Sequence, residues 1–170
     1  LSGEKGIGKS TLAYHLINFI LSEDEEFSYD MKSLKIDPEN RSFKLLQNKS
    51  FKLLQNKSNP NFKLVDVNEE KKMIDINQIR NLILHLNKSS FNNKARFVLI
   101  DNIELLNINA VNALLKILEE PNDNINFILI NNNKRILPTL KSRCLNFKIQ
   151  LTTNQVFVVV NKILKDNYIN

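Results

Sequence analysis

Residues 3–10 read Gly-Glu-Lys-Gly-Ile-Gly-Lys-Ser and match the pattern G-x-x-x-x-G-K-[ST] at every fixed position. The glycines allow backbone angles that other residues rarely adopt, so the loop can turn its N–H groups onto phosphate oxygens. Lys9 supplies positive charge for the terminal phosphates, and the Ser10 hydroxyl can ligate Mg²⁺. The segment that follows predicts a helix over residues 11–21, whose dipole would point at the same anion. The stretch therefore predicts a phosphate-binding loop (P-loop) that holds a nucleotide with Mg²⁺.

The expected nucleotide contacts extend over the whole loop and the first helical turn. They are Gly3, Glu4, Lys5, Gly6, Ile7, Gly8, Lys9, Ser10 and Thr11. A P-loop normally follows a buried strand, yet only Leu1 and Ser2 precede this one and there is no initiator Met. We therefore expect a truncated first strand and a chain that is part of a longer protein.

Composition narrows the class of protein. A length of 170 residues with 42% hydrophobic side chains suits one α/β domain with the start of a second. The chain has no apolar run long enough for a membrane helix. Cys144 is the single cysteine, so we expect no intrachain disulfide, no zinc and a reducing cytoplasm. The net charge of +6 fits contact with nucleic acid, and it fits a solvated Lys-rich surface equally well.

Apolar runs that suit strands alternate with segments of helical periodicity, which is typical of parallel βαβ units. Strands are expected at residues 62–67, 95–100, 125–130 and 145–149, and helices at residues 11–21, 76–87, 107–120 and 152–166. Residues 137–143 suggest a short helix or a turn. Asp75 is the expected N-cap of the second helix, and Asn107 or Asn109 that of the third. An identical octet repeats in tandem over residues 43–58. It indicates a local duplication to which we assign no function.

A carboxylate follows the most apolar of these strands. Residues 97–100 read Phe-Val-Leu-Ile and end at Asp101, which should lie beside the P-loop and hold Mg²⁺ opposite Ser10. Asn102 comes next, where hydrolytic enzymes of this build usually carry a glutamate that polarises the attacking water. Because an amide cannot accept a proton at neutral pH, we expect the chain's own ATPase activity to be weak or absent.

Three stretches together carry a family resemblance. They are Phe-Val-Leu-Ile-Asp-Asn at residues 97–102, Asn-Ala-Leu-Leu-Lys-Ile-Leu-Glu-Glu-Pro at 112–121 and Leu-Pro-Thr-Leu-Lys-Ser-Arg-Cys at 137–144. They closely resemble the AAA+ module of bacterial clamp-loader subunits of DNA polymerase III, most of all the delta-prime type. The resemblance implies an α/β P-loop NTPase domain over residues 1–150, with a mainly parallel five-stranded sheet flanked by helices. Residues 151–170 would begin a helical lid domain.

The resemblance also implies assembly. Clamp loaders are heteropentameric arcs with nucleotide at the subunit interfaces, so the expected partners are gamma/tau and delta subunits. The sliding clamp and primer-template DNA would be met through the complex, in the cytoplasm at the nucleoid-associated replisome, with no membrane. Arg143 would act in trans as an arginine finger in a neighbour's ATP and Mg²⁺ site. Asn131 or Asn132 would be the polar sensor of the γ-phosphate.

Two functions remain open at this point. In the first, the chain is a subunit of DNA polymerase III that binds ATP without rapid turnover and donates Arg143 during DNA replication. In the alternative, it is a hydrolytically competent ATPase of the gamma/tau type. Asn102 and the Leu-Pro-Thr pattern at residues 137–139 favour the first.

Overall fold

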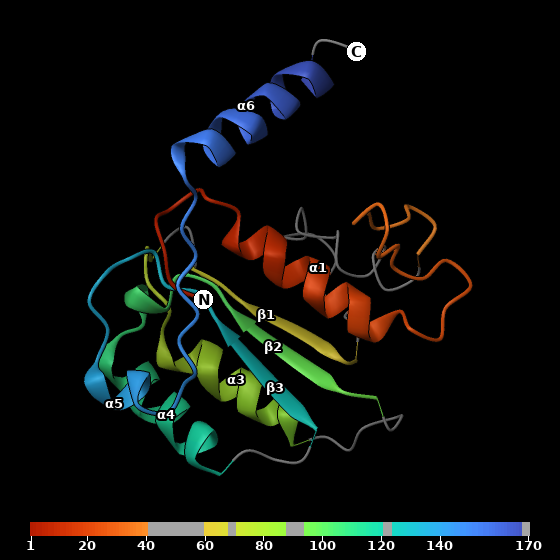
Figure 1. Cartoon of the computed structure of the whole chain (residues 1–170). Coiled ribbons are helices and arrows are strands. Elements are labelled where there is room, and N and C mark those ends of the chain that lie inside the picture. Colours follow the sequence, from red (N-terminus) through yellow and green to blue (C-terminus); the bar gives the residue numbers. More distant parts are fainter. Residues whose placement is uncertain (41–59, 68–70, 88–93, 121–123, 168–170) are drawn as a thin grey trace.

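The structure is a computed structural model that describes residues 1–40, 60–67, 71–87, 94–120 and 124–167. The duplicated octet at residues 43–58 lies outside these residues, so its role stays a prediction. Figure 1 shows the described chain as a sheet packed between helices, with one helix standing away from the body.

The centre of the sheet is β2 (Arg96–Ile100), in which every residue is buried. It pairs in parallel with β1 (Phe62–Val65) on one side and β3 (Ile125–Leu129) on the other, giving the order β1-β2-β3. A continuous apolar run suits this position, because both faces of a parallel sheet are covered. The prediction of an α/β fold with a parallel sheet is confirmed.

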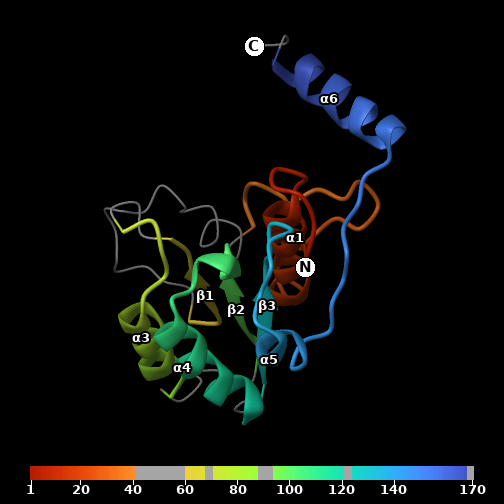
Figure 2. The ribbon, with the colours of Figure 1, turned by 90° about the vertical axis from the view of Figure 1, so that its left-hand side faces the viewer.

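The side chains of β2 point alternately to the two faces. Phe97 and Leu99 pack in one core cluster with Ile17 of α1 (Lys9–Leu21). Val98 and Ile100 belong to the other cluster, which contains buried residues of α3 (Ile76–Leu86) and α4 (Ile108–Glu119). Figure 2 shows α1 on one side of the sheet and α3 and α4 on the other. The fold is therefore three-layered, and the P-loop at the start of α1 lies over one face of the sheet.

Two of the expected helix starts are confirmed by their caps. The Asp75 side chain accepts hydrogen bonds from the backbone N–H groups of Asn77 and Gln78, and the Gln78 side chain completes a capping box. The Asn107 side chain accepts from the N–H of Ala110, so Asn107 caps α4 in preference to Asn109. Both caps satisfy N–H groups that have no partner inside the helix.

The expected five-stranded sheet is not confirmed, because the described residues form three strands. The truncated first strand is reduced to Ser2, which forms isolated parallel bridges with Asn131 after β3 and with Lys148. The expected strand at residues 145–149 is likewise reduced to that bridge. Leu145 and Phe147 are 86% and 60% exposed, so no packed layer holds them in extended register.

Of the last two described helices, α5 (Pro138–Lys141) packs on the core through the buried Leu140, and α6 (Thr153–Asn167) leaves the body of the fold. α5 begins within the Leu-Pro-Thr stretch, with Leu137 as its N-cap, and α6 confirms the last predicted helix. Figures 1 and 2 both show α6 extending away from the sheet and its helices. Its assignment to a separate lid domain stays a prediction. Among the described helices, none combines the length and hydropathy that a membrane crossing requires.

Candidate phosphate-binding site

The P-loop adopts backbone angles that favour glycine. Gly6 and Gly8 have φ angles of 88° and 89°, in the left-handed region that L side chains rarely occupy. Gly8 precedes α1, and its carbonyl accepts the 2.9 Å hydrogen bond from the N–H of Leu12. A Cβ at either glycine would meet nothing within 4 Å. Conformation is therefore the reason for glycine at these two positions.

Gly3 is required for a different reason. A Cβ at Gly3 would lie 2.4 Å from the carbonyl oxygen of Ile149 and 2.8 Å from a methyl carbon of Ile7. The neighbouring backbone is held by hydrogen bonds, because the N–H of Ile149 donates to the carbonyl of Ser2 at 2.7 Å. The start of the loop is therefore pressed against the segment that carries Lys148 and Ile149.

This contact predicts unequal costs for two alanine substitutions. We expect Gly3→Ala to lower the free energy of unfolding by about 2–3 kcal/mol, because backbone must shift to admit the methyl group. Gly6→Ala has open space and carries only the left-handed conformational penalty, about 1 kcal/mol. Urea denaturation of both variants measures the difference. Equal losses would show that the Gly3 contact is not tight in solution.

Lys9 is almost fully buried, with 3% of its surface exposed. Its Nζ donates to the carbonyl oxygen of Gly3 at 3.0 Å and also to that of Glu4. Burial lowers the pKa of Lys9 below its ordinary value, and the carboxylates of Asp101 and Glu104 act in the opposite direction. The structure thus holds a desolvated ammonium group inside the curve of the loop.

Ser10 and Asp101 meet as the sequence predicts. The Ser10 Oγ donates to Asp101 Oδ2 at 2.7 Å, across the gap between α1 and the end of β2. Asp101 is buried, and its other oxygen accepts from the N–H of Asn102 at 2.9 Å. A hydroxyl and a carboxylate at this separation are oxygen ligands of the kind that Mg²⁺ prefers. These two residues therefore fit the expected metal position.

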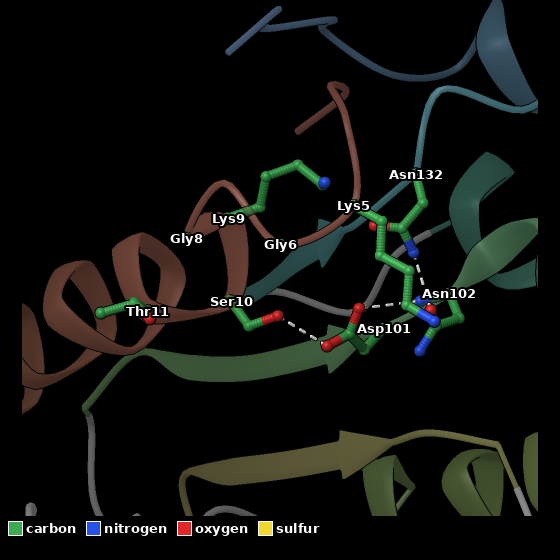
Figure 3. Close-up of a pocket in the computed structure, with 9 residues that line it drawn as sticks. All are labelled: Lys5, Gly6, Gly8, Lys9, Ser10, Thr11, Asp101, Asn102 and Asn132. Atoms are coloured by element: carbon green, nitrogen blue, oxygen red, sulfur yellow. Dashed lines mark hydrogen bonds between the residues drawn. The ribbon is translucent and has the colours of Figure 1, made fainter. Parts of the chain in front are cut away.

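A pocket of about 340 Å³ lies between the loop and the ends of the strands. Figure 3 shows its lining, in which the Lys5 side chain extends from the loop toward the wall formed by Asp101 and Asn102. The lining residues are Lys5, Gly6, Gly8, Lys9, Ser10, Thr11, Asp101, Asn102 and Asn132. The other expected contacts, Gly3, Glu4 and Ile7, belong to the loop but are not among the lining residues.

The two candidate sensors occupy different positions. Asn131 uses its side chain within a turn, where Nδ2 donates to the carbonyl of Lys134 and Oδ1 accepts from the Lys134 N–H. Asn132 lines the pocket instead. The geometry therefore favours Asn132 as the residue that would face a nucleotide.

Two acidic residues at the site were missed by the sequence reasoning. Asp66 follows β1, and its Oδ1 accepts from Asn102 Nδ2 at 2.9 Å. Glu104 lies in the short helix η2 (Ile103–Leu105), and its Oε1 accepts from Asn132 Nδ2 at 3.0 Å. Asn102 joins the two sides, because its Oδ1 accepts from Asn132 Nδ2 at 2.7 Å. The carboxyl ends of all three strands are thus connected by side-chain hydrogen bonds.

Arg143 is not part of this pocket. It directly follows the α5 region, which lies well apart from the P-loop in Figures 1 and 2. Its guanidinium forms an ion pair with Glu119 at the end of α4 and donates to the carbonyl of Thr139 at 2.8 Å. The Arg143 side chain is partly exposed, and Arg143 is not among the residues that line the pocket of this chain.

Cys144 follows Arg143 and is half-buried. Burial raises the pKa of its thiol. Among the residues that the structure describes, no group of three or more His, Cys, Asp or Glu side chains is placed to hold a metal ion. The expectation of no zinc stays a prediction.

Comparison with known proteins identifies a family. A family model described as DNA polymerase III, delta subunit matches residues 1–153. The chain is 36% identical over 88 residues to the delta-prime subunit of DNA polymerase III from Pseudomonas aeruginosa, covering 51% of this chain and 27% of that protein. It is 30% identical over 168 residues to the gamma subunit from Buchnera aphidicola subsp. Schizaphis graminum, covering 97% of this chain and 41% of that protein.

Among solved structures, a DNA polymerase III gamma subunit-related protein of Thermotoga maritima aligns with a TM-score of 0.46 at 28% identity. That alignment covers 54% of this chain and 31% of the other. The chain therefore spans well under half the length of the relatives described here.

Proposed function

The chain belongs to the DNA polymerase III delta subunit family, and on that premise we propose that it acts as a clamp-loader subunit in DNA replication. In this proposal it binds ATP with Mg²⁺ at the P-loop and supplies Arg143 to a neighbouring subunit. Its partners are the gamma/tau and delta subunits, and through the complex the sliding clamp and primer-template DNA. Such a subunit works in the cytoplasm, at the nucleoid-associated replisome.

One observation supports the proposal of nucleotide binding most strongly. The side chains of Lys9, Ser10 and Asp101 line the same pocket. The loop supplies the buried ammonium of Lys9, and Ser10 and Asp101 lie in hydrogen-bond contact opposite it. Magnesium, when bound, neutralises charge on the terminal phosphates. Ser10 and Asp101 would hold that ion, Lys9 would bind phosphate oxygens, and the loop N–H groups would complete the anion site.

The state of Asn102 supports a subunit that binds nucleotide better than it cleaves it. Its amide is engaged on both sides, donating to Asp66 and accepting from Asn132. Asn102 also has a φ angle of 60°, a left-handed conformation that asparagine tolerates better than most residues. Position 102 therefore supplies no general base. General-base catalysis contributes on the order of 10²–10⁴-fold to the rate of such reactions.

A gamma/tau-type ATPase is the second candidate. It is favoured by the gamma subunit of Buchnera aphidicola, whose match covers 97% of this chain. Both candidates would bind nucleotide, so the rate of ATP hydrolysis by this chain is what distinguishes them.

Phosphate release from ATP, measured on the intact protein alone and in the assembled complex, separates them. We expect the wild-type site to release phosphate no faster than a Lys9→Ala control. A carboxylate introduced at position 102 would face Asp66, so Asn102→Glu should raise turnover only in combination with Asp66→Asn, by up to about 10²-fold. Turnover by the wild type that Lys9→Ala abolishes would instead establish the gamma/tau-type function.

A further inference from the structure

Two amides lie in a row between two carboxylates at the carboxyl ends of the strands. We name Asp66, Asn102, Asn132 and Glu104 the amide chain. Asn102 Nδ2 donates to Asp66 Oδ1 at 2.9 Å, and Asn132 Nδ2 donates both to Asn102 Oδ1 at 2.7 Å and to Glu104 Oε1 at 3.0 Å. Glu104 is itself fixed, because its Oε2 accepts from the backbone N–H of Asn132 at 3.3 Å.

The carboxylates determine which way both amides point. An ionised carboxylate can only accept hydrogen bonds, whereas an amide has a donor end and an acceptor end. Reversing Asn102 would place its oxygen against Asp66, and reversing Asn132 would place its oxygen against Glu104. Reversing one amide alone would also bring like ends of Asn102 and Asn132 together. The observed direction is therefore the one in which every contact pairs a donor with an acceptor.

The orientation of the two amides determines which atom of the Asn132 side chain faces the pocket. Both acceptors of its Nδ2 belong to the amide chain, so the carbonyl oxygen remains for the pocket that Asn132 lines. Figure 3 shows that oxygen directed to the side of the P-loop while the nitrogen points to Asn102. The Asp101 carboxylate lies on the same wall. The surface of the pocket at the strand ends thus presents the oxygen atoms of Asn132 and Asp101, and the Lys5 side chain extends toward it from the loop.

We propose that the amide chain makes this site prefer a nucleoside diphosphate over a triphosphate. The inference rests on the proposed nucleotide-binding function and adds a ligand preference to it. Phosphates held by the loop meet N–H groups and Lys9, but a further phosphate toward the strand ends meets the Asn132 oxygen where a donor is required. Leaving such a polar contact unmade weakens binding by about tenfold. Asp66 and Glu104 are positioning residues, because they act through the two amides.

The experiment is a double-mutant cycle on relative affinity. Dissociation constants for Mg-ADP and Mg-ATP are measured by calorimetry on the full chain as wild type, Asp66→Asn, Glu104→Gln and the double variant. In the wild type we expect ADP to bind about tenfold more tightly than ATP. Each single variant keeps one carboxylate, which still prevents the two amides from reversing. The ratio of the ATP and ADP dissociation constants should therefore stay at the wild-type value. The double variant lets both amides reverse, and the ratio should fall to about one.

This non-additivity separates orientation from a merely structural role. Glu26→Gln removes the same charge from an exposed site away from the pocket and is the matched control, expected to keep the wild-type ratio. A wild type that binds both nucleotides equally would overturn the inference and leave the proposed function standing. A ratio that falls in each single variant would also overturn it, because one carboxylate should suffice. A wild type that binds neither nucleotide would overturn the proposed function and the inference with it.

Discussion

Arg143→Ala is expected to reduce ATP hydrolysis at the site of the neighbouring subunit by about 10³-fold in a reconstituted clamp loader. A guanidinium that reaches the γ-phosphate stabilises charge that develops during transfer, and alanine supplies none. Arg143→Lys should recover little, because an ammonium lacks the planar fork. The measurement is DNA-stimulated phosphate release by the complex, together with nucleotide binding by this subunit, which should not change.

The structure provides a matched control for this prediction. Glu119 forms the ion pair with Arg143, so Glu119→Gln breaks the same contact while keeping the guanidinium. An exposed ion pair contributes about 0–1 kcal/mol, and Thr139 keeps a partner in Ser142 Oγ, so neither variant should unfold the chain. A complex whose rate is the same with Arg143 or alanine would remove the finger role. Equal losses in both variants would assign the effect to the ion pair.

Lys9→Ala is expected to weaken Mg-nucleotide binding at this chain's own site by at least about 100-fold. Hydrogen bonds to charged groups contribute about 1.5–3 kcal/mol each, and Lys9 would make more than one with the terminal phosphates. Its buried position strengthens this effect, because the charge is poorly screened by solvent. Titration of the intact protein with Mg-ADP and Mg-ATP gives the change in dissociation constant.

Two further variants test whether charge at this position is responsible. Lys9→Met keeps the apolar stem and fills the same space, so it should lose as much affinity as alanine. Lys5→Ala removes a lysine that also lines the pocket but belongs to the exposed part of the loop, and we expect a loss of a few-fold. Equal affinity of the wild type and Lys9→Ala would contradict nucleotide binding by the P-loop.

The parts of the fold that sequence predicts well are those in which local pattern and burial agree. β2 is buried throughout and apolar after Arg96, so its run of residues 97–100 and the position of Asp101 followed directly. The cap at Asp75 was predicted directly, and the cap at Asn107 was one of two candidates, because such side chains satisfy N–H groups of their own helix. Tertiary packing decided the rest, as in the predicted strand at residues 145–149, where no layer covers the exposed side chains of Leu145 and Phe147.

The residues of the candidate site likewise fall into those that the sequence predicts and those that only the structure reveals. Lys9, Ser10 and Asp101 were found because fixed spacings in the sequence identify them. Asp66 had the same signal as Asp101, an acidic residue at the end of a predicted strand, and could have been included on that ground. Glu104 had none: the turn through η2 brings it back to Asn132, and nothing in the local pattern predicts that return. The choice between Asn131 and Asn132 likewise required the turn at Lys134.

The close approach of Gly3 to Ile149 connects the phosphate loop mechanically to α6. Ser2 is hydrogen-bonded to both Phe147 and Ile149, and α6 begins at Thr153, a short length of backbone further on. The contact at Gly3 has no room for a methyl group. The segment that leads into α6 is therefore anchored by two backbone hydrogen bonds and a close steric contact at the first residues of the phosphate-binding loop.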